Sequence, residues 1–259
     1  MQAAYSQASC AERSQLAKPN DSDALSAEAR AQLLDFWQRR ADGEWTTAAA
    51  LQHVFDDLVV LGAPAALRDL VTVAIADEHR HTTWCAQAAR ELGGRDFRPS
   101  VLGHRPFALQ GASEAENRLL RVIFAGCIGE TIAIHVLRES HAELERGPVR
   151  EVNRLHMSEE VNHARVGWAF LNWAKERGLL HAAARQSIQN ALPSLLELSS
   201  SAWLTGGRAV TPDLRRRGFI DSIHIERGLA RAFEEVIRPG FERFDLCLAV
   251  TEWNYGCRV

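Results

Sequence analysis

Two stretches of the chain place carboxylates and imidazoles at helical spacing. His156, Glu160 and His163 follow one another at offsets of four and three residues, and Glu78 and His81 repeat the second offset. On an α-helix these offsets bring side chains to one face, so each group can point at a single object in the interior. One Glu-x-x-His arises easily by chance on a solvated helix. Two copies indicate a metal site if the rest of the chain brings them together.

The composition predicts an all-α protein. Alanine, leucine, arginine and glutamate are plentiful in the 259 residues, and alternation of β-branched residues is scarce. A loop over about 95–112 is long enough to cross from one helix pair to another. Capping residues, glycines and prolines mark the expected helix boundaries. The expected helices span about 26–61 with a break near Asp42 and Gly43, then 64–92, 113–145, 148–177, 181–204 and 217–237, the last closed by Pro239-Gly240.

Four glutamates lie at similar distances from two helix turns. Each is 13 to 18 residues from its turn, with Glu44 and Glu78 on either side of Gly62, and Glu130 and Glu160 on either side of Gly147. At about 1.5 Å per residue, all four are roughly 20 to 27 Å along their helices. Folded as antiparallel hairpins, the two halves form a weak repeat with its polar residues at one level.

The repeated residues suit a pair of divalent metal ions. One Glu from each of two helices and a Glu-x-x-His from each of the other two is the ligand set of carboxylate-bridged di-iron and di-manganese bundles. Ile123, Cys127 and Ile134 lie along the Glu130 face. An unpaired charge there would cost several kcal/mol. Four such carboxylates require positive charge, and oxygen and imidazole donors suit iron or manganese.

Several other residues compete for this site. Asp56 and Asp57 are alternatives to Glu44, but they lie too close to the turn to reach the same level. Cys85 and Cys127 lie on the faces of Glu78 and Glu130, and we interpret them as small core residues. With five scattered cysteines and no CxxC pair, neither a disulfide framework nor a structural zinc site is expected.

The remaining histidines are placed less well by spacing. His53 and His135 are rotated roughly 140 to 180 degrees from the Glu44 and Glu130 faces, so we expect them outside the site. His224 and Glu226 reach the cluster only if their helix covers the bundle.

The segments Asp77-Glu-His-Arg-His81 and Glu159-Glu-Val-Asn-His163 resemble the D/E-E-x-R-H segments of the ferritin-like di-iron superfamily. The likeness covers about 40–178. It implies that Asp77 and Glu159 do not bind metal themselves but each hold a metal-binding histidine. Such a histidine needs a partner of this kind to fix its tautomer. Asn162 occupies a position where arginine is usual, so a matching polar network is not implied there.

The H-x-x-x-E-x-x-H arrangement of the second segment resembles the arylamine N-oxygenases of the p-aminobenzoate N-oxygenase type. That resemblance implies a di-iron site of four glutamates and three histidines, and the order and approximate spacing of seven residues fit it: Glu44, Glu78, His81, Glu130, His156, Glu160 and His163. The alternative for His156 is a histidine that lines the site without binding metal.

The expected fold is a ferritin-like four-helix bundle with a central dinuclear metal site and additional N- and C-terminal helices. We expect a flexible N-terminal arm over 1–25 and a single helical domain over 26–259. Within it, the core bundle covers about 44–178 and covering helices lie at about 181–237.

The leading hypothesis is a non-haem di-iron oxygenase that uses O2 to oxidise a small organic substrate, most readily the nitrogen of an amine. It implies two iron ions, with manganese as an option, and an electron donor; a homodimer is a candidate assembly. The net charge of −3 does not suggest nucleic acid as a partner. The sequence contains no run of about 18 apolar residues, so we expect no contact with a membrane and a cytoplasmic protein. The alternatives are a ferroxidase or other di-metal protein without an organic substrate, and a metal-free helical interaction module.

Overall fold

The computed structural model describes residues 25–98, 108, 113–204 and 210–247. All of the expected arm except Leu25, and most of the expected 95–112 loop, lie outside the described residues. Every regular element within the described ranges is helical.

The first helix, α1 (Ala27–Val60), is continuous. Ser26 caps its first turn, as expected. The predicted break near Asp42 and Gly43 is wrong, since both residues lie exposed within the helix. A glycine inside a helix costs only about 1 kcal/mol relative to alanine, which the burial of apolar residues on either side offsets.

The first hairpin is completed by α2 (Ala65–Glu91), and the second hairpin ends with α5 (Pro148–Glu176). Between them, the helix expected over 113–145 starts at a capping box formed by Ser113 and Glu116. It is divided into three consecutive parts: α3 (Glu114–Val122), the π-helical segment η2 (Ile123–Gly129) and α4 (Glu130–Glu143). Such π segments are frequent at functional sites.

The C-terminal part contains more short elements than expected: α6 (Ala182–Leu204), α7 (Pro212–Arg216), α8 (Ser222–Ala232), a second π segment η3 (Phe233–Ile237) and α9 (Arg238–Glu242). The predicted helix start at 217 and stop at Pro239-Gly240 are wrong. Pro239 lies in the first turn of α9, a position that tolerates proline. Gly240 allows a close approach, because a Cβ there would lie 2.5 Å from the Trp168 ring.

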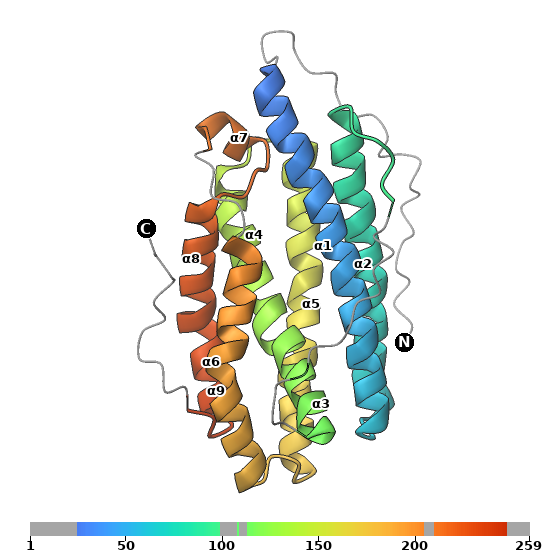
Figure 1. Cartoon of the computed structure of the whole chain (residues 1–259), viewed down its shortest axis with the longest axis vertical. Helices are drawn as coiled ribbons and strands as arrows, with labels where there is room; N and C mark the ends of the chain where they lie inside the picture. Colours follow the sequence, from blue (N-terminus) through green and yellow to red (C-terminus); the bar gives the residue numbers. More distant parts are fainter. Residues whose placement is uncertain (1–24, 99–107, 109–112, 205–209, 248–259) are drawn as a thin grey trace, which may run out of the picture.

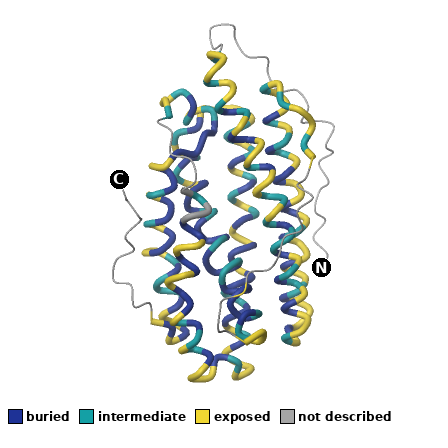
Figure 2. The backbone as a smooth tube through the Cα atoms, in the orientation of Figure 1, coloured by how far each residue is buried: buried dark blue, intermediate teal, exposed yellow. Residues whose placement is uncertain are grey.

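The helices form a four-helix bundle with a further layer on one side. Figure 1 shows the α1–α2 hairpin beside the α3–α5 hairpin, and α6 and α8 on the far side of α4. The α3–α4 helix therefore has neighbours on both sides, and Figure 2 shows it mostly buried. By length and composition, Glu114–Glu143 would also suit a membrane span, but 72% of its apolar window is buried inside the protein. We therefore interpret it as the core helix of a bundle.

The second hairpin is held by a very close helix crossing. A Cβ on Gly126 of η2 would lie 2.5 Å from the Gly167 nitrogen of α5, and a Cβ on Gly167 would lie 2.4 Å from the Cys127 nitrogen. Only glycine fits both positions at this separation. The crossing lies four residues from Glu130 and from His163, so it sets how closely these two side chains approach.

We predict that Gly167→Ala lowers the free energy of unfolding by about 1–3 kcal/mol, because the added methyl group must push η2 away from α5. The matched control is Gly43→Ala, which has nothing within 4 Å of the new Cβ. It is expected to stabilise the protein by about 0.5–1 kcal/mol through helix propensity. Denaturant unfolding of both variants checks the pair. A Gly167→Ala variant as stable as the wild type would contradict the close crossing.

Candidate metal centre

The structure brings all seven sequence-predicted ligand residues together inside the bundle. They come from four helices and form two groups whose candidate ligand atoms lie within 4.8 Å of one another. The first group contains Glu78, Glu130, Glu160 and His163; the second contains Glu44, His81, His156 and Glu160. Glu160 belongs to both groups, so its two carboxylate oxygens are placed to connect them.

The first group is fully buried and centred on one imidazole nitrogen. His163 Nδ1 lies 3.0 Å from Glu78 Oε1, 3.1 Å from Glu160 Oε2 and 3.9 Å from Glu130 Oε2. Glu130 is the first residue of α4 after the π segment. Three carboxylates and one imidazole therefore converge from α2, α4 and α5.

The second group has two imidazoles packed together, with ring centroids of His81 and His156 3.7 Å apart. His156 Nε2 lies 2.7 Å from Glu160 Oε1 and 3.8 Å from Glu44 Oε1. His81 Nδ1 lies 3.6 Å from both Glu160 Oε1 and Glu78 Oε2. Glu44 is slightly more accessible than the other ligands, with 13% of its side chain exposed.

The donor set fits a pair of cations. Six buried atoms of the cluster make no hydrogen bond despite the short distances: both carboxylate oxygens of Glu78, Glu160 Oε2, and the ring nitrogens His81 Nδ1, His156 Nε2 and His163 Nδ1. Buried polar atoms are normally hydrogen-bonded, and leaving one unpaired costs about 1–3 kcal/mol. Carboxylate oxygens and ring nitrogens that converge in this way, without hydrogen bonds between them, are a donor set that bound metal ions would satisfy.

Without metal, the same cluster favours bound protons. Burial and the nearby Glu160 raise the pKa of Glu78 to about 7, and burial with the two neighbouring carboxylates raises the pKa of Glu130 well above its usual range. Burial acts to lower the pKa of His81, but the hydrogen bond to Glu159 and the nearby carboxylates raise it to about 9. Divalent cations would take the place of these protons.

Two acidic residues behind the cluster hold histidines of the opposite segment. Glu159, beside Glu160 on α5, accepts from His81 Nε2 at 2.9 Å. Asp77, beside Glu78 on α2, accepts from His163 Nε2 at 3.2 Å. A carboxylate only accepts, so each Nε2 carries a proton, and each Nδ1 is the ring nitrogen left to bind a metal ion at the centre. The sequence pointed to both acids, but not to this crossed pairing.

One arginine joins the two acids. Arg80, about half exposed, donates to Glu159 Oε1 at 3.0 Å and to Asp77. Asn162, where the superfamily pattern has arginine, accepts instead from Arg165 at 3.0 Å. A single guanidinium therefore contacts both acids, and Asn162 makes its hydrogen bond with Arg165 instead.

Arg40 is a site residue that the sequence interpretation missed. Its Nη2 donates to Glu44 Oε1 at 3.0 Å and lies 3.1 Å from His156 Nδ1. The guanidinium lies over the Trp37 ring, 5.8 Å from its centroid. The only sequence feature that pointed to this contact was the i, i+4 spacing of Arg40 and Glu44.

The competing residues lie outside both groups. Asp57 pairs with Arg118 and Arg121, in place of reaching the Glu44 position. Cys85 and Cys127 are buried thiols; burial raises the pKa of Cys85 to about 12 and that of Cys127 well above its usual value. Neither thiol belongs to either group of candidate ligands.

The other histidines also have separate partners. His135 Nδ1 lies 2.8 Å from the Thr131 carbonyl oxygen, and His224 lies beside Asp221 and Glu143. Neither His53 nor Glu226 belongs to either group.

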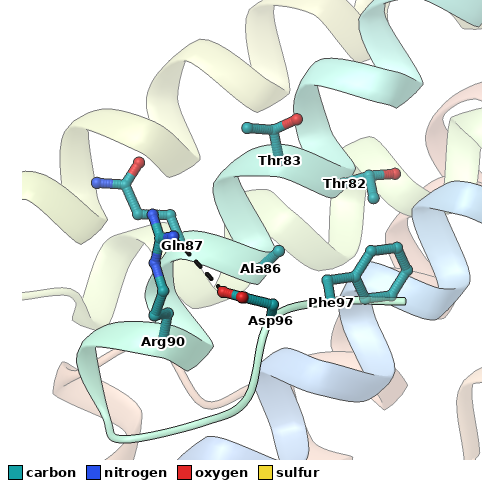
Figure 3. A pocket seen from close by; sticks show the side chains of 7 residues that line it. All are labelled: Thr82, Thr83, Ala86, Gln87, Arg90, Asp96 and Phe97. Atoms are coloured by element: carbon teal, nitrogen blue, oxygen red, sulfur yellow. Dashed lines mark ion pairs between the residues drawn. The ribbon is translucent and has the colours of Figure 1, made fainter. Parts of the chain in front are cut away.

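A pocket of about 330 Å³ lies between the C-terminal half of α2 and the segment that follows this helix (Figure 3). Its lining residues are Thr82, Thr83, Ala86, Gln87, Arg90, Asp96 and Phe97. Arg90 and Asp96 form an ion pair at 3.7 Å across its edge. None of the seven candidate ligands lines it, although Thr82 follows His81 directly.

Comparison with known proteins adds independent information. A family model described as p-aminobenzoate N-oxygenase AurF matches residues 48–222, which are 175 of the 259 residues. Six of the seven candidate ligands lie within this range, and Glu44 lies just before it. The chain is also similar to a solved structure, a Synechococcus protein with aldehyde deformylating oxidase activity. The identity is 18%, with 85% of this chain and 92% of the other covered and a TM-score of 0.56, a likeness of fold. No curated protein matches the chain.

The crossed pairing predicts that Glu159→Gln lowers the affinity for a divalent metal about 10- to 100-fold, because His81 loses the charged acceptor that orients its ring and makes Nδ1 a better donor. Glu176→Gln, an exposed charge change on the same helix, is the matched control and should leave affinity unchanged. Anaerobic titration with Fe²⁺ measures both variants. Equal affinity for Glu159→Gln and the wild type would show that this contact does not support the centre.

Proposed function

Because the chain belongs to the p-aminobenzoate N-oxygenase AurF family, we propose that it is an oxygenase that uses O2 to oxidise the nitrogen of a small amine. The coarser statement, a ferritin-like di-iron oxidoreductase, follows from the family and the fold. The amine as substrate goes beyond what the family and the fold give, and it is the part that we propose.

The observation that carries the proposal is the position of His156. It adds a third histidine to a set of four glutamates and two histidines, and only one half of the repeat has it. Its Nε2 faces Glu160 and Glu44 from within the second group. This geometry supports a binding role over the alternative in which His156 only lines the site.

The residues have distinct tasks in this proposal. The first group would hold one iron ion, the second group would hold the other, and Glu160 would contact both. Two ferrous ions bound there would supply electrons for the reduction of O2. Asp77 and Glu159 hold the protons on the outer nitrogens of His163 and His81, so the inner nitrogens stay available. The burial of the cluster excludes bulk water from the reacting groups.

The chemistry needs an electron donor. Oxidation of a primary amine to a hydroxylamine by O2 consumes two electrons and two protons and yields one water molecule, with one oxygen atom placed on nitrogen. These two electrons would come once from the ferrous ions, so repeated turnover needs an external reductant to restore them.

The principal alternative is a ferroxidase without an organic substrate. The additional helices favour the oxygenase, because α6 and α8 pack along the α3–α4 helix that carries Glu130. A four-helix subunit that only oxidises iron does not need this extra layer. The two functions differ in their products: an oxygenase transfers an oxygen atom of O2 to the organic substrate, whereas a ferroxidase does not.

We predict that protein loaded anaerobically with about two Fe²⁺ per chain, then given a chemical reductant and ¹⁸O2, transfers ¹⁸O to nitrogen in a panel of aryl and alkyl amines. Mass spectrometry of the products provides the measurement. Glu160→Ala should lose both metal and product, whereas Glu226→Gln, on α8 outside both groups, should retain them.

Two outcomes would reject the proposal. Rapid oxidation of iron with no labelled organic product would support the ferroxidase. Failure to bind more than one iron ion per chain would remove the dinuclear centre itself.

A further inference from the structure

The three histidines of the centre differ in the residue that contacts the ring nitrogen facing away from the centre. His81 and His163 each donate from Nε2 to a carboxylate, whereas His156 has a guanidinium 3.1 Å from its Nδ1. A guanidinium can only donate hydrogen bonds, so Nδ1 of His156 must accept. The proton of the neutral imidazole is then on Nε2, the nitrogen that faces Glu160 and Glu44.

Arg40 also satisfies Glu44. Its Nε and Nη2 donate to Glu44 Oε1 at 3.3 and 3.0 Å, and both side chains are only 13% exposed. Among the described residues, by contrast, no arginine or lysine forms an ion pair with Glu78, Glu130 or His163 of the first group, whose ion-pair partners are one another, Glu160, His81 and Asp77. Arg40 therefore contacts Glu44 and His156 of the second group directly, whereas the described residues place no such cation against Glu78, Glu130 or His163.

We propose that Arg40 makes the two halves of the centre unequal and so orders metal loading. The first ion enters the group of Glu78, Glu130, Glu160 and His163. The second ion enters the group of Glu44, His81, His156 and Glu160 more weakly, because it must take Glu44 and His156 from Arg40. This inference rests on the proposed dinuclear centre and assigns a regulatory role to a residue that is not itself a ligand.

Two physical effects oppose the second ion. Arginine remains charged in proteins, and its positive charge repels an incoming cation at short range in a buried site. In addition, Nε2 of His156 offers a lone pair to metal only after its proton moves to Nδ1, the atom to which Arg40 donates. Neither effect acts at His163, whose outer partner is the carboxylate of Asp77.

The test uses Mn²⁺ as the probe, because it resists oxidation by O2 at neutral pH and its free concentration is measured from its EPR signal. We expect the wild type to bind two Mn²⁺ per chain with affinities that differ at least about tenfold, given the charge of Arg40 beside one half only. Glu130→Gln should abolish the tight phase, and Glu44→Gln should abolish the weak phase.

Two variants of Arg40 distinguish an effect of its positive charge from a role in holding Glu44 and His156 in place. Arg40→Gln removes the charge and should tighten the weak phase about tenfold or more, and Arg40→Lys keeps the charge and should leave it weak. The matched control is Arg39→Gln, which removes an exposed neighbouring charge paired with Asp35 and should change neither phase. Circular dichroism checks that each variant is helical before titration.

Equal affinities in the wild type, or a weaker second phase in Arg40→Gln, would overturn ordered loading while leaving the dinuclear function in place. In the second case Arg40 would act as a scaffold for Glu44 and His156. Absence of binding by either Mn²⁺ or Fe²⁺ would overturn the proposed function as well.

Discussion

Four glutamates buried among the apolar side chains of a helical bundle require positive charge at the same place. Glu78, Glu130 and Glu160 are nearly inaccessible to solvent, and Glu44 is little more exposed. Isolated ionised carboxylates in such surroundings would cost several kcal/mol each. In the metal-free protein the raised pKa values of Glu78, Glu130 and His81 favour protons on these groups, and these protons and the charge of Arg40 meet this requirement. Two bound cations would replace the protons and satisfy the unpaired nitrogen and oxygen atoms.

The polar contacts around the centre follow the repeat on one side and break it on the other. Asp77 and Glu159 occupy equivalent positions, each holds the histidine of the opposite helix, and Arg80 joins them. These contacts tie α2 to α5 directly. Arg40 and His156 have no equivalents, and they lie together on the side of Glu44. The asymmetry of the site therefore comes from two residues on α1 and α5, while the remaining ligands obey the repeat.

Much of the fold and site follows from spacing, because helix periodicity and turn positions determine which side chains share a level. Spacing alone therefore predicted that Glu44, despite its polar neighbours, lies in the same cluster as Glu160. Contacts between helices were not accessible in this way. The crossed pairing of Asp77 and Glu159 depends on how α2 and α5 are rotated against one another. The π segment before Glu130 lies where Gly126 packs against Gly167, a contact between helices that local propensity does not encode.

The most direct measurement is a crystal structure of the protein loaded anaerobically with Fe²⁺, with anomalous differences recorded on both sides of the iron absorption edge. We predict two iron peaks in the bundle, with Glu160 in contact with both. The remaining ligands should divide between them as Glu78, Glu130 and His163 for one ion and Glu44, His81 and His156 for the other. A single peak, or two peaks of which neither contacts Glu160, would contradict a dinuclear centre built from these seven residues.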